Sequence, residues 1–530
     1  MRVAMGGVLA CAALVAFGAG PAAADDVQAC QQARDIAACG RLIADGRYAS
    51  ADRAALYLSR AIAYAAAGEL DHAIADYGEA IKLAPSAPAY FDRGLAFARR
   101  GRLGQAIADY DAAINVDPSY VPALRVRAAA WAAKGDLDRA IADYGAVIRL
   151  DAKDAAAWYG RGRAFRRQGD LDRALADLDR AITLDPANAA AYFARASAWS
   201  AKGDADRAIA DYDAVIRLRA DDAAAWFNRA GAWVAKGNHD RALADYGEAI
   251  RLDPKDADAH VGRADVLAAK GDLDGAIADY GAAIGLDAKN ARAYAGRGIA
   301  WRRKGNLDAA IADYDAAIGL DPKDAASLRN RGIAWAAKGD VDRAIVDYAH
   351  ATELDPTDAA TFINLGNAWS AKHDLDRAIA AYGAAIAREP NSADAYNNRA
   401  LAFMAKGDLD RAIADYGAAI AREPKNARLY LGRAVALRRK GDLDRTIADD
   451  DSAIALAPAA AAAYFNRALA FSARGDLDRA IADFDRTIEL RPNDAAAYYN
   501  RGLAKQRQGN IGAGDADVAA ARRLDPHIGR

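Results

Sequence analysis

The 530-residue sequence contains few of the residues on which catalytic and metal sites usually depend. It has three cysteines and six histidines, and its formal net charge is −2. No cysteine pair has zinc-ligand spacing, no histidine lies in an HExxH motif, and neither Gly-x-Ser-x-Gly nor a phosphate-binding loop is present. The balanced charge gives no general attraction to nucleic acid or anionic membranes. We therefore expect no enzyme, no metal site, no cofactor and no nucleic-acid partner.

Long apolar runs are absent beyond the first residues. Val3–Phe17 is apolar but shorter than the ~20 residues that a membrane span needs. Ala22–Ala24 before Asp25 has the A-x-A pattern of a cleavage site, so residues 1–24 are interpreted as a secretory signal peptide. A membrane anchor is the alternative. A further alternative is lipidation at Cys11, which would attach the protein to a membrane.

Removal of this segment would leave two cysteines, Cys30 and Cys39, in a compartment that permits disulfides. Gln28–Arg34 and Asp35–Ala44 have the pattern of a shortened helical hairpin, which a disulfide would close. A bond across so short a loop contributes roughly 2–3 kcal/mol. Two buried free thiols are the alternative. We predict an N-terminal hairpin over residues 25–53 with a Cys30–Cys39 disulfide.

The rest of the chain repeats one pattern. Lys134–Tyr144, KGDLDRAIADY, recurs unchanged as Lys406–Tyr416, and close variants lie between and beyond. A fixed period of this length indicates a repeat array, here fourteen repeats over residues 54–530. The turn residues lie 34 apart, with a single step of 33, at Gly68, Gly101, Gly135, Gly169, Gly203, Gly237, Gly271, Gly305, Gly339, His373, Gly407, Gly441, Gly475 and Gly509.

Each repeat predicts two helices. Ala155–Arg167 has apolar residues at helical spacing and ends at Gly169, since glycine takes the left-handed conformation that helix ends often need. Asp170 then favours the start of a second helix, and Pro186 stops it. Neither helix could bury its apolar face alone, so neighbouring repeats must stack.

These residues resemble the tetratricopeptide repeat. Most repeats have an aromatic residue eleven before the turn, a small residue seven before, an aromatic nine after and a proline seventeen after. Alanine replaces the proline in three repeats, at Ala152, Ala220 and Ala288. His373 replaces a turn glycine, and Lys505 replaces an aromatic residue. The resemblance implies an all-α, right-handed superhelical solenoid. Its concave groove usually binds an extended peptide or a helix of another protein. The DLDRAIADY-rich sequence resembles exported bacterial members.

An arginine and an aspartate recur on either side of the turn. Numbering positions from the turn residue, arginine is at −8 and aspartate at +8 in every repeat except that of His373, which has Leu365 and Ala381. Because the two residues are lost together, we predict a ladder of Arg–Asp pairs that touch, partly buried beside the core. The alternative is a basic stripe for an anionic ligand.

Family geometry places positions −10, −6, −3 and −2 on the concave side. Aromatic residues and arginines there suit a peptide that carries apolar side chains and carboxylates. Alternatively, the arginines are solvated helix ends, where cations are favoured in any case. The predicted ligand-binding residues are Tyr159, Arg163, Arg166, Arg167, Phe193, Phe227, Arg302, Arg303, Arg438 and Arg439.

The sequence therefore predicts a non-enzymatic scaffold in the bacterial periplasm or envelope, or secreted, that binds a protein or peptide partner in this groove. The alternative is an envelope scaffold that binds, or helps to export, an acidic polysaccharide. No repeat assembles the lysine and asparagine set of the family's carboxylate clamp, so binding of chaperone tails is not expected.

Overall fold

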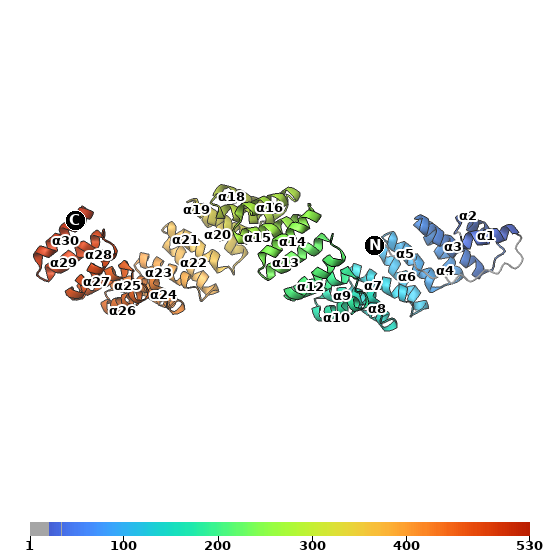
Figure 1. Cartoon of the computed structure of the whole chain (residues 1–530), viewed down its shortest axis with the longest axis horizontal. Coiled ribbons are helices and arrows are strands. Elements are labelled where there is room, and N and C mark those ends of the chain that lie inside the picture. Colours follow the sequence, from blue (N-terminus) through green and yellow to red (C-terminus); the bar gives the residue numbers. More distant parts are fainter. Residues whose placement is uncertain (1–20, 33, 530) are drawn as a thin grey trace. The chain divides into compact units, whose positions relative to one another are not determined.

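The computed structural model describes residues 21–32 and 34–529. These residues form thirty α-helices and no strand, which confirms an all-α helical repeat architecture. Nearly all of the predicted signal peptide, Cys11 included, lies outside the described residues. The chain divides into two compact halves, Met1–Lys255 and Asp256–Arg530, coloured blue to green and green to red in Figure 1. In the described part of the chain, no helix has the length and apolar character that a bilayer crossing requires.

The helices follow one another in pairs; α1 and α2 form the N-terminal hairpin, and each later pair is one repeat. In the first half they are α1 (Pro21–Gln31), α2 (Ile36–Ala44), α3 (Ser50–Ala67), α4 (Leu70–Leu83), α5 (Ala87–Arg99), α6 (Leu103–Val116), α7 (Val121–Lys134), α8 (Leu137–Leu150), α9 (Ala155–Gln168), α10 (Leu171–Leu184), α11 (Ala189–Ala201), α12 (Ala205–Leu218), α13 (Ala223–Ala235) and α14 (His239–Leu252). In the second half they are α15 (Ala257–Lys270), α16 (Leu273–Leu286), α17 (Ala291–Arg303), α18 (Leu307–Leu320), α19 (Ala325–Ala337), α20 (Val341–Leu354), α21 (Ala359–Ala371), α22 (Leu375–Arg388), α23 (Ala393–Lys406), α24 (Leu409–Arg422), α25 (Ala427–Lys440), α26 (Leu443–Leu456), α27 (Ala461–Arg474), α28 (Leu477–Leu490), α29 (Ala495–Arg507) and α30 (Ile511–Leu524).

The predicted helix ends are confirmed in the repeat of α9 and α10. Gly169 closes α9 with a left-handed φ of 84°, and the Asp170 side chain accepts from the backbone N–H of Arg173 to cap α10. Where His373 replaces the turn glycine, its φ is 62°, so the turn keeps the same conformation with a residue that adopts it less readily.

The N-terminal hairpin also forms. The structure joins Cys30 and Cys39 by a disulfide, and both lie fully buried beside Leu42 and Leu56. Leu56 belongs to α3, so the hairpin packs directly on the array. Because α3 begins at Ser50, a single helix runs across the predicted boundary at residue 54.

A tyrosine at +9 forms the centre of most repeats. Its ring lies between the first helix of its own repeat and the first helix of the next. A Cβ added at Gly298 would lie 2.8 Å from Cε1 of Tyr314, and one at Gly296 would lie 2.5 Å from Cζ of Tyr280. The first helices can therefore approach these rings closely only because the residue at −7 is small and, in some repeats, the residue at −9 is glycine.

The predicted Arg–Asp ladder is confirmed, both within and between repeats. Arg161 in α9 donates Nε and Nη2 to the two oxygens of Asp177 in α10, at 2.7 and 2.9 Å, and Asp177 is 5 % exposed. Arg127 pairs in the same way with Asp143 and also donates Nη1, at 2.7 Å, to Asp111 of the preceding repeat. Since these guanidinium groups are taken up by internal carboxylates, they do not form a basic stripe for a ligand.

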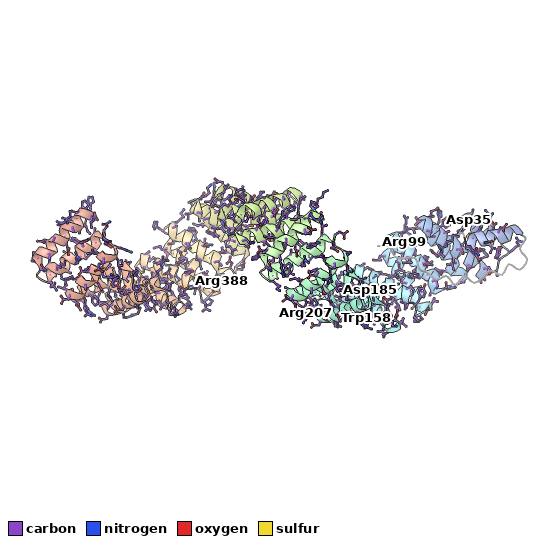
Figure 2. All side chains as sticks on the ribbon, in the orientation of Figure 1. Asp35, Arg99, Trp158, Asp185, Arg207 and Arg388 are labelled. Carbon is purple, nitrogen blue, oxygen red and sulfur yellow. A yellow bond between two sulfur atoms is a disulfide. The ribbon has the colours of Figure 1, made fainter. Side chains whose placement is uncertain are left out.

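Two further sets of contacts, which sequence reasoning missed, cover the turns. Lys202, at −1, bonds Asp172 of the preceding repeat at 2.5 Å, and equivalent pairs recur along the array. Arg207, labelled in Figure 2, lies with its guanidinium carbon 4.5 Å from the ring centroid of Trp199. Asp172 has 85 % of its side chain exposed, so the Lys202 pair contributes little to stability.

Candidate functional site

Within each half of the chain, the residues at −10, −6 and −3 of successive first helices form a surface, which we call the first-helix face of that half. Neighbouring first helices such as α9 and α11 contact one another directly. Beneath the surface lie the +9 rings, of which Tyr212, Tyr314 and Tyr416 are at most 1 % exposed. In every repeat except that of His373, the Arg–Asp ladder ties the first helix to the second helix behind it. The first-helix face is therefore held by packed rings and ion pairs rather than by loops.

The three predicted aromatic residues lie on this face and are half-buried. Phe193 meets Tyr212 edge-on with ring centroids 5.5 Å apart, and Phe227 meets Tyr246 in the same way at 5.6 Å. Tyr159 packs on the core around Ile182. Each ring is anchored by a buried neighbour and leaves part of its surface available for contact.

Arg163 and Arg166 belong to the same helix, α9, as Tyr159. The Arg163 side chain is exposed, with its guanidinium carbon 5.4 Å from the Tyr159 ring centroid. Arg166 is half-buried, and its Nε is buried without a hydrogen-bond partner. Burial raises the pKa of Tyr212 of the next repeat, and the Arg166 charge partly offsets the rise, which places Arg166 near that ring.

The arginines at −2 have a structural contact instead. Arg167 donates Nη1 to the Ala132 carbonyl at 2.6 Å, and Arg303 donates to the Ala268 carbonyl at 2.6 Å, each 35 residues back. Arg439 makes the equivalent bond, at 3.3 Å, to the Met404 carbonyl. These carbonyls lie in the last turn of the preceding first helix, where each already accepts from the N–H of the turn glycine and takes the arginine as a second donor. The −2 arginines therefore cap the neighbouring repeat.

The arginines at −3 have no such contact with a carbonyl. Like Arg166, Arg302 has a buried Nε without a hydrogen-bond partner in the described part of the chain. It lies against Tyr314, where burial raises the pKa of the hydroxyl and the interaction with the Arg302 side chain partly offsets that rise. Arg438 donates Nε to Asn466 Oδ1 at 2.6 Å, and its Nη atoms make no hydrogen bond within the described residues. The structure thus separates each adjacent arginine pair into one capping residue and one with guanidinium donors to spare.

Sequence reasoning missed a group of asparagines in the second half, which lie at −6 on the first-helix face and at the neighbouring position −9. Asn367 Oδ1 accepts from the Tyr382 hydroxyl at 2.7 Å and from Asn398 Nδ2 at 3.2 Å. Asn330 and Asn364 are half-buried, at −9 like Asn398. The signal for this group was present in the sequence, since asparagine occupies −9 in three consecutive repeats.

Two carboxyl groups near this face have strongly raised pKa values. Burial raises the pKa of Asp92 to about 6, and Arg99, labelled in Figure 2, partly opposes the rise. Burial raises the pKa of Asp450 to about 8. Asp450 stands at +9, where other repeats have an aromatic or aliphatic residue, so the sequence departs from its own pattern at this position.

The described residues contain no group of three or more side chains suited to holding a metal ion. The buried histidine nearest to a carboxylate, His260, lies 3.3 Å from Asp279, and Arg263 already bonds both oxygens of that aspartate. His260 therefore belongs to the Arg–Asp ladder.

The fold and this face define the class: an α-helical repeat protein in which successive first helices of each half present an ordered surface. The chain belongs to the tetratricopeptide repeat family. The model described as "Tetratricopeptide repeat" matches residues 58–121, 128–189, 193–257, 234–291, 263–325, 296–359, 363–416 and 398–461, and the one described as "TPR repeat" matches 470–509. Membership supports a role as a protein-interaction scaffold.

Several solved structures are similar. The MamA protein is 26 % identical, covering 32 % of this chain and 94 % of its own, with a TM-score of 0.31. YrrB, described as a TPR protein with an unusual peptide-binding site, is 24 % identical over 35 % of this chain and 95 % of its own, with a TM-score of 0.32. Yeast Tom70 is 19 % identical over 83 % and 97 %, with a TM-score of 0.32. No curated protein matches the chain.

Proposed function

We propose that the protein is a non-enzymatic scaffold that binds peptide or helical segments of a partner protein on its first-helix face. The observation that carries the proposal is the unused hydrogen-bonding capacity of the −3 arginines. The arginines of the ladder and the −2 arginines are occupied by carboxylates or carbonyls. Arg166 and Arg302 lie beside the rings of Tyr212 and Tyr314, and within the described residues neither of them bonds a carboxylate or a carbonyl, so their guanidinium Nη donors remain available.

The chemistry of this face fits a partner with apolar and acidic side chains. Half-exposed rings such as Phe193 and Phe227 offer apolar contact, and a guanidinium group can bind a carboxylate through two parallel bonds. The amides of Asn330, Asn364 and Asn398 each supply a donor and an acceptor, the pair that an extended peptide backbone requires. An extended acidic segment would therefore find contacts for its side chains and its backbone.

Substitution of the −3 arginines should separate binding from folding. We expect the triple variant Arg166→Ala, Arg302→Ala, Arg438→Ala to lose a bound polypeptide in a pull-down from envelope extract. One charge-assisted hydrogen bond is worth ~1.5–3 kcal/mol, so removal of each such bond to the partner should lower affinity at least tenfold. The matched control removes the −2 arginines: Arg167→Ala, Arg303→Ala, Arg439→Ala. It should fold less stably but still bind.

Loss of binding in both triple variants, or in neither, would contradict this assignment. Recovery of an acidic glycan that elutes steeply with salt would instead support the alternative of a scaffold for an acidic polysaccharide. Arg302 and Arg438, both in the second half, lie four repeats apart in sequence, a regularity that also suits a ligand with repeated acidic groups.

We further propose that the protein is exported to the periplasm or envelope. The buried Cys30–Cys39 disulfide supports this location, because disulfides persist in oxidising compartments. We expect the mature protein, isolated from the envelope fraction, to begin at Asp25 when its N-terminal peptide is sequenced by mass spectrometry. A cytosolic protein that retains Met1 would contradict export, and a lipid on Cys11 would point to membrane anchoring.

A further inference from the structure

The repeat of α25 and α26 replaces the central ring with a carboxyl group. Asp450 occupies +9 on α26 and is fully buried, at 0 % exposure. Its Oδ2 accepts from Asn466 Nδ2 of α27 at 2.8 Å, and its Oδ1 is buried and has no hydrogen-bond partner among the described residues. An unpartnered buried carboxyl oxygen is costly, so a structural role alone gives no reason for an acid here.

Asn466 links this carboxyl to Arg438. An arginine can only donate, so the bond of 2.6 Å from Arg438 Nε requires the oxygen of the Asn466 amide to face α25. The amide nitrogen must then face Asp450. The link is therefore directional, and Arg438 and Asp450 are separated by one side-chain amide.

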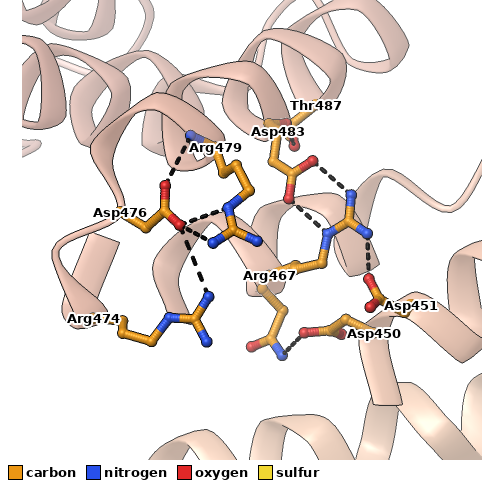
Figure 3. A network of polar contacts seen from close by, with 9 residues as sticks. Asp450, Asp451, Arg467, Arg474, Asp476, Arg479, Asp483 and Thr487 are labelled. Atoms are coloured by element: carbon orange, nitrogen blue, oxygen red, sulfur yellow. Dashed lines mark hydrogen bonds and ion pairs between the residues drawn. The ribbon is translucent and has the colours of Figure 1, made fainter. Parts of the chain in front are cut away.

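The other charged groups around Asp450 are already paired. From α27, Arg467 bonds both oxygens of Asp483 and also bonds Asp451, as Figure 3 shows. On α26 itself, Asp449 accepts both bonds of Arg433 from α25. Among the described residues near Asp450, Arg438 is a cation without a carboxylate partner, and the adjacent Arg439 bonds the Met404 carbonyl. An ionised Asp450 would therefore find its countercharge at Arg438.

An equivalent site in the same half lacks the acid. Four repeats earlier, Arg302 stands in place of Arg438, Tyr314 in place of Asp450 and Asn330 in place of Asn466. Burial raises the pKa of the Tyr314 hydroxyl, so this site keeps a neutral group where the later one has a titratable acid. The chain thus contains its own matched control.

We propose that Arg438, Asn466 and Asp450 form a proton-gated site for an acidic group of the partner. With Asp450 neutral, the Arg438 guanidinium binds a carboxylate or a similar anion. When Asp450 is ionised, its negative charge balances the positive charge of Arg438, so the anion binds weakly. The inference rests on the proposed function, because it assumes that the −3 arginines receive acidic groups.

The gate has a reciprocal consequence. If ionisation of Asp450 weakens anion binding by some factor, a bound anion must make Asp450 harder to ionise by the same factor. A tenfold coupling, for example, moves the titration midpoint of Asp450 upward by about one pH unit. The effect of pH on anion binding and the effect of the bound anion on the titration of Asp450 can both be measured in one sample.

The test uses sulfate as the anion, because sulfate remains a dianion across the pH range. Binding is followed by NMR of the asparagine-labelled full chain, through the side-chain amide resonances of Asn466 and Asn330. Two variants isolate the sites: Arg166→Ala with Arg302→Ala leaves Arg438, and Arg166→Ala with Arg438→Ala leaves Arg302. Sodium chloride at equal ionic strength is the control for screening.

We expect sulfate to bind the Arg438 site about tenfold more weakly at pH 9.5 than at pH 6.5, and the Arg302 site about equally at both. Asp450→Asn should remove the pH dependence while binding persists. Equal affinity at the Arg438 site at both pH values would overturn the gate but leave the anion site. Sulfate that shifts neither amide at either pH would overturn the proposed role of the −3 arginines as well.

Discussion

Replacing Asp177 by alanine is expected to lower the free energy of unfolding by ~3–5 kcal/mol, because it leaves one partner of a buried ion pair without its countercharge. Asp177 is 5 % exposed, and Arg161 keeps only 22 % of its side chain exposed. No second acid is placed to take over, since Gly145 occupies the position from which Asp111 reaches the next arginine. Urea unfolding of the full chain, with hydrogen exchange in α9 and α10, would measure the loss.

Two other aspartates serve as matched controls for this experiment. Asp143→Ala should cost less than Asp177→Ala, because Arg127 retains Asp111 at 2.7 Å. Asp172→Ala removes only an exposed partner and should change stability by less than about 1 kcal/mol. Equal effects of all three substitutions would show that the ladder does not act through buried charge.

The second large effect is expected at Asp450. A carboxyl group with an ordinary pKa near 4 in the unfolded chain and about 8 in the folded one binds more protons when folded between those values, so stability falls as pH rises. The cost is absent below about pH 4 and complete above about pH 8. At pH 7 it amounts to about 3–5 kcal/mol. An aspartate whose pKa is lowered by an ion pair behaves in the opposite way.

Asp450→Asn should remove this cost, so the variant should be more stable than the parent at pH 7 and about as stable at pH 4. Comparing the two chains at each pH cancels the titration of every other group, Asp92 included. Asp450→Tyr, which restores the ring found in most repeats, tests whether the space also accepts the larger side chain. A constant difference between Asp450→Asn and the parent from pH 4 to pH 8 would show that Asp450 has no raised pKa.

The repeat fold could be predicted because its determinants are local or strictly periodic. Gly169 and Asp170 mark a helix end and a helix start within adjacent residues, and both have the expected geometry. The Arg–Asp pairing was also predictable, since Leu365 and Ala381 replace both partners in the same repeat. A single repeat in which both residues change together was enough to predict the pairing, because the other thirteen repeats keep both.

The candidate site could be predicted only in part. The sequence placed Phe193 and Phe227 on the first-helix face, and both lie there, half-buried against a tyrosine ring. It did not separate Arg166 from Arg167. The two are adjacent on α9, and their difference depends on the Ala132 carbonyl, which the stacking of the preceding repeat brings within 2.6 Å of Arg167.

The sequence by itself determined the repeat length, the helix pairs, the buried tyrosines and the pairing of charges, because each of these follows from the spacing of residues along one repeat. The tertiary structure decided which charges are satisfied and which are not. Hydrogen bonds such as that of Arg438 to Asn466, and the enclosure of Asp450, join neighbouring repeats. They depend on how two helices pack in space, which the residue pattern of either helix alone does not specify.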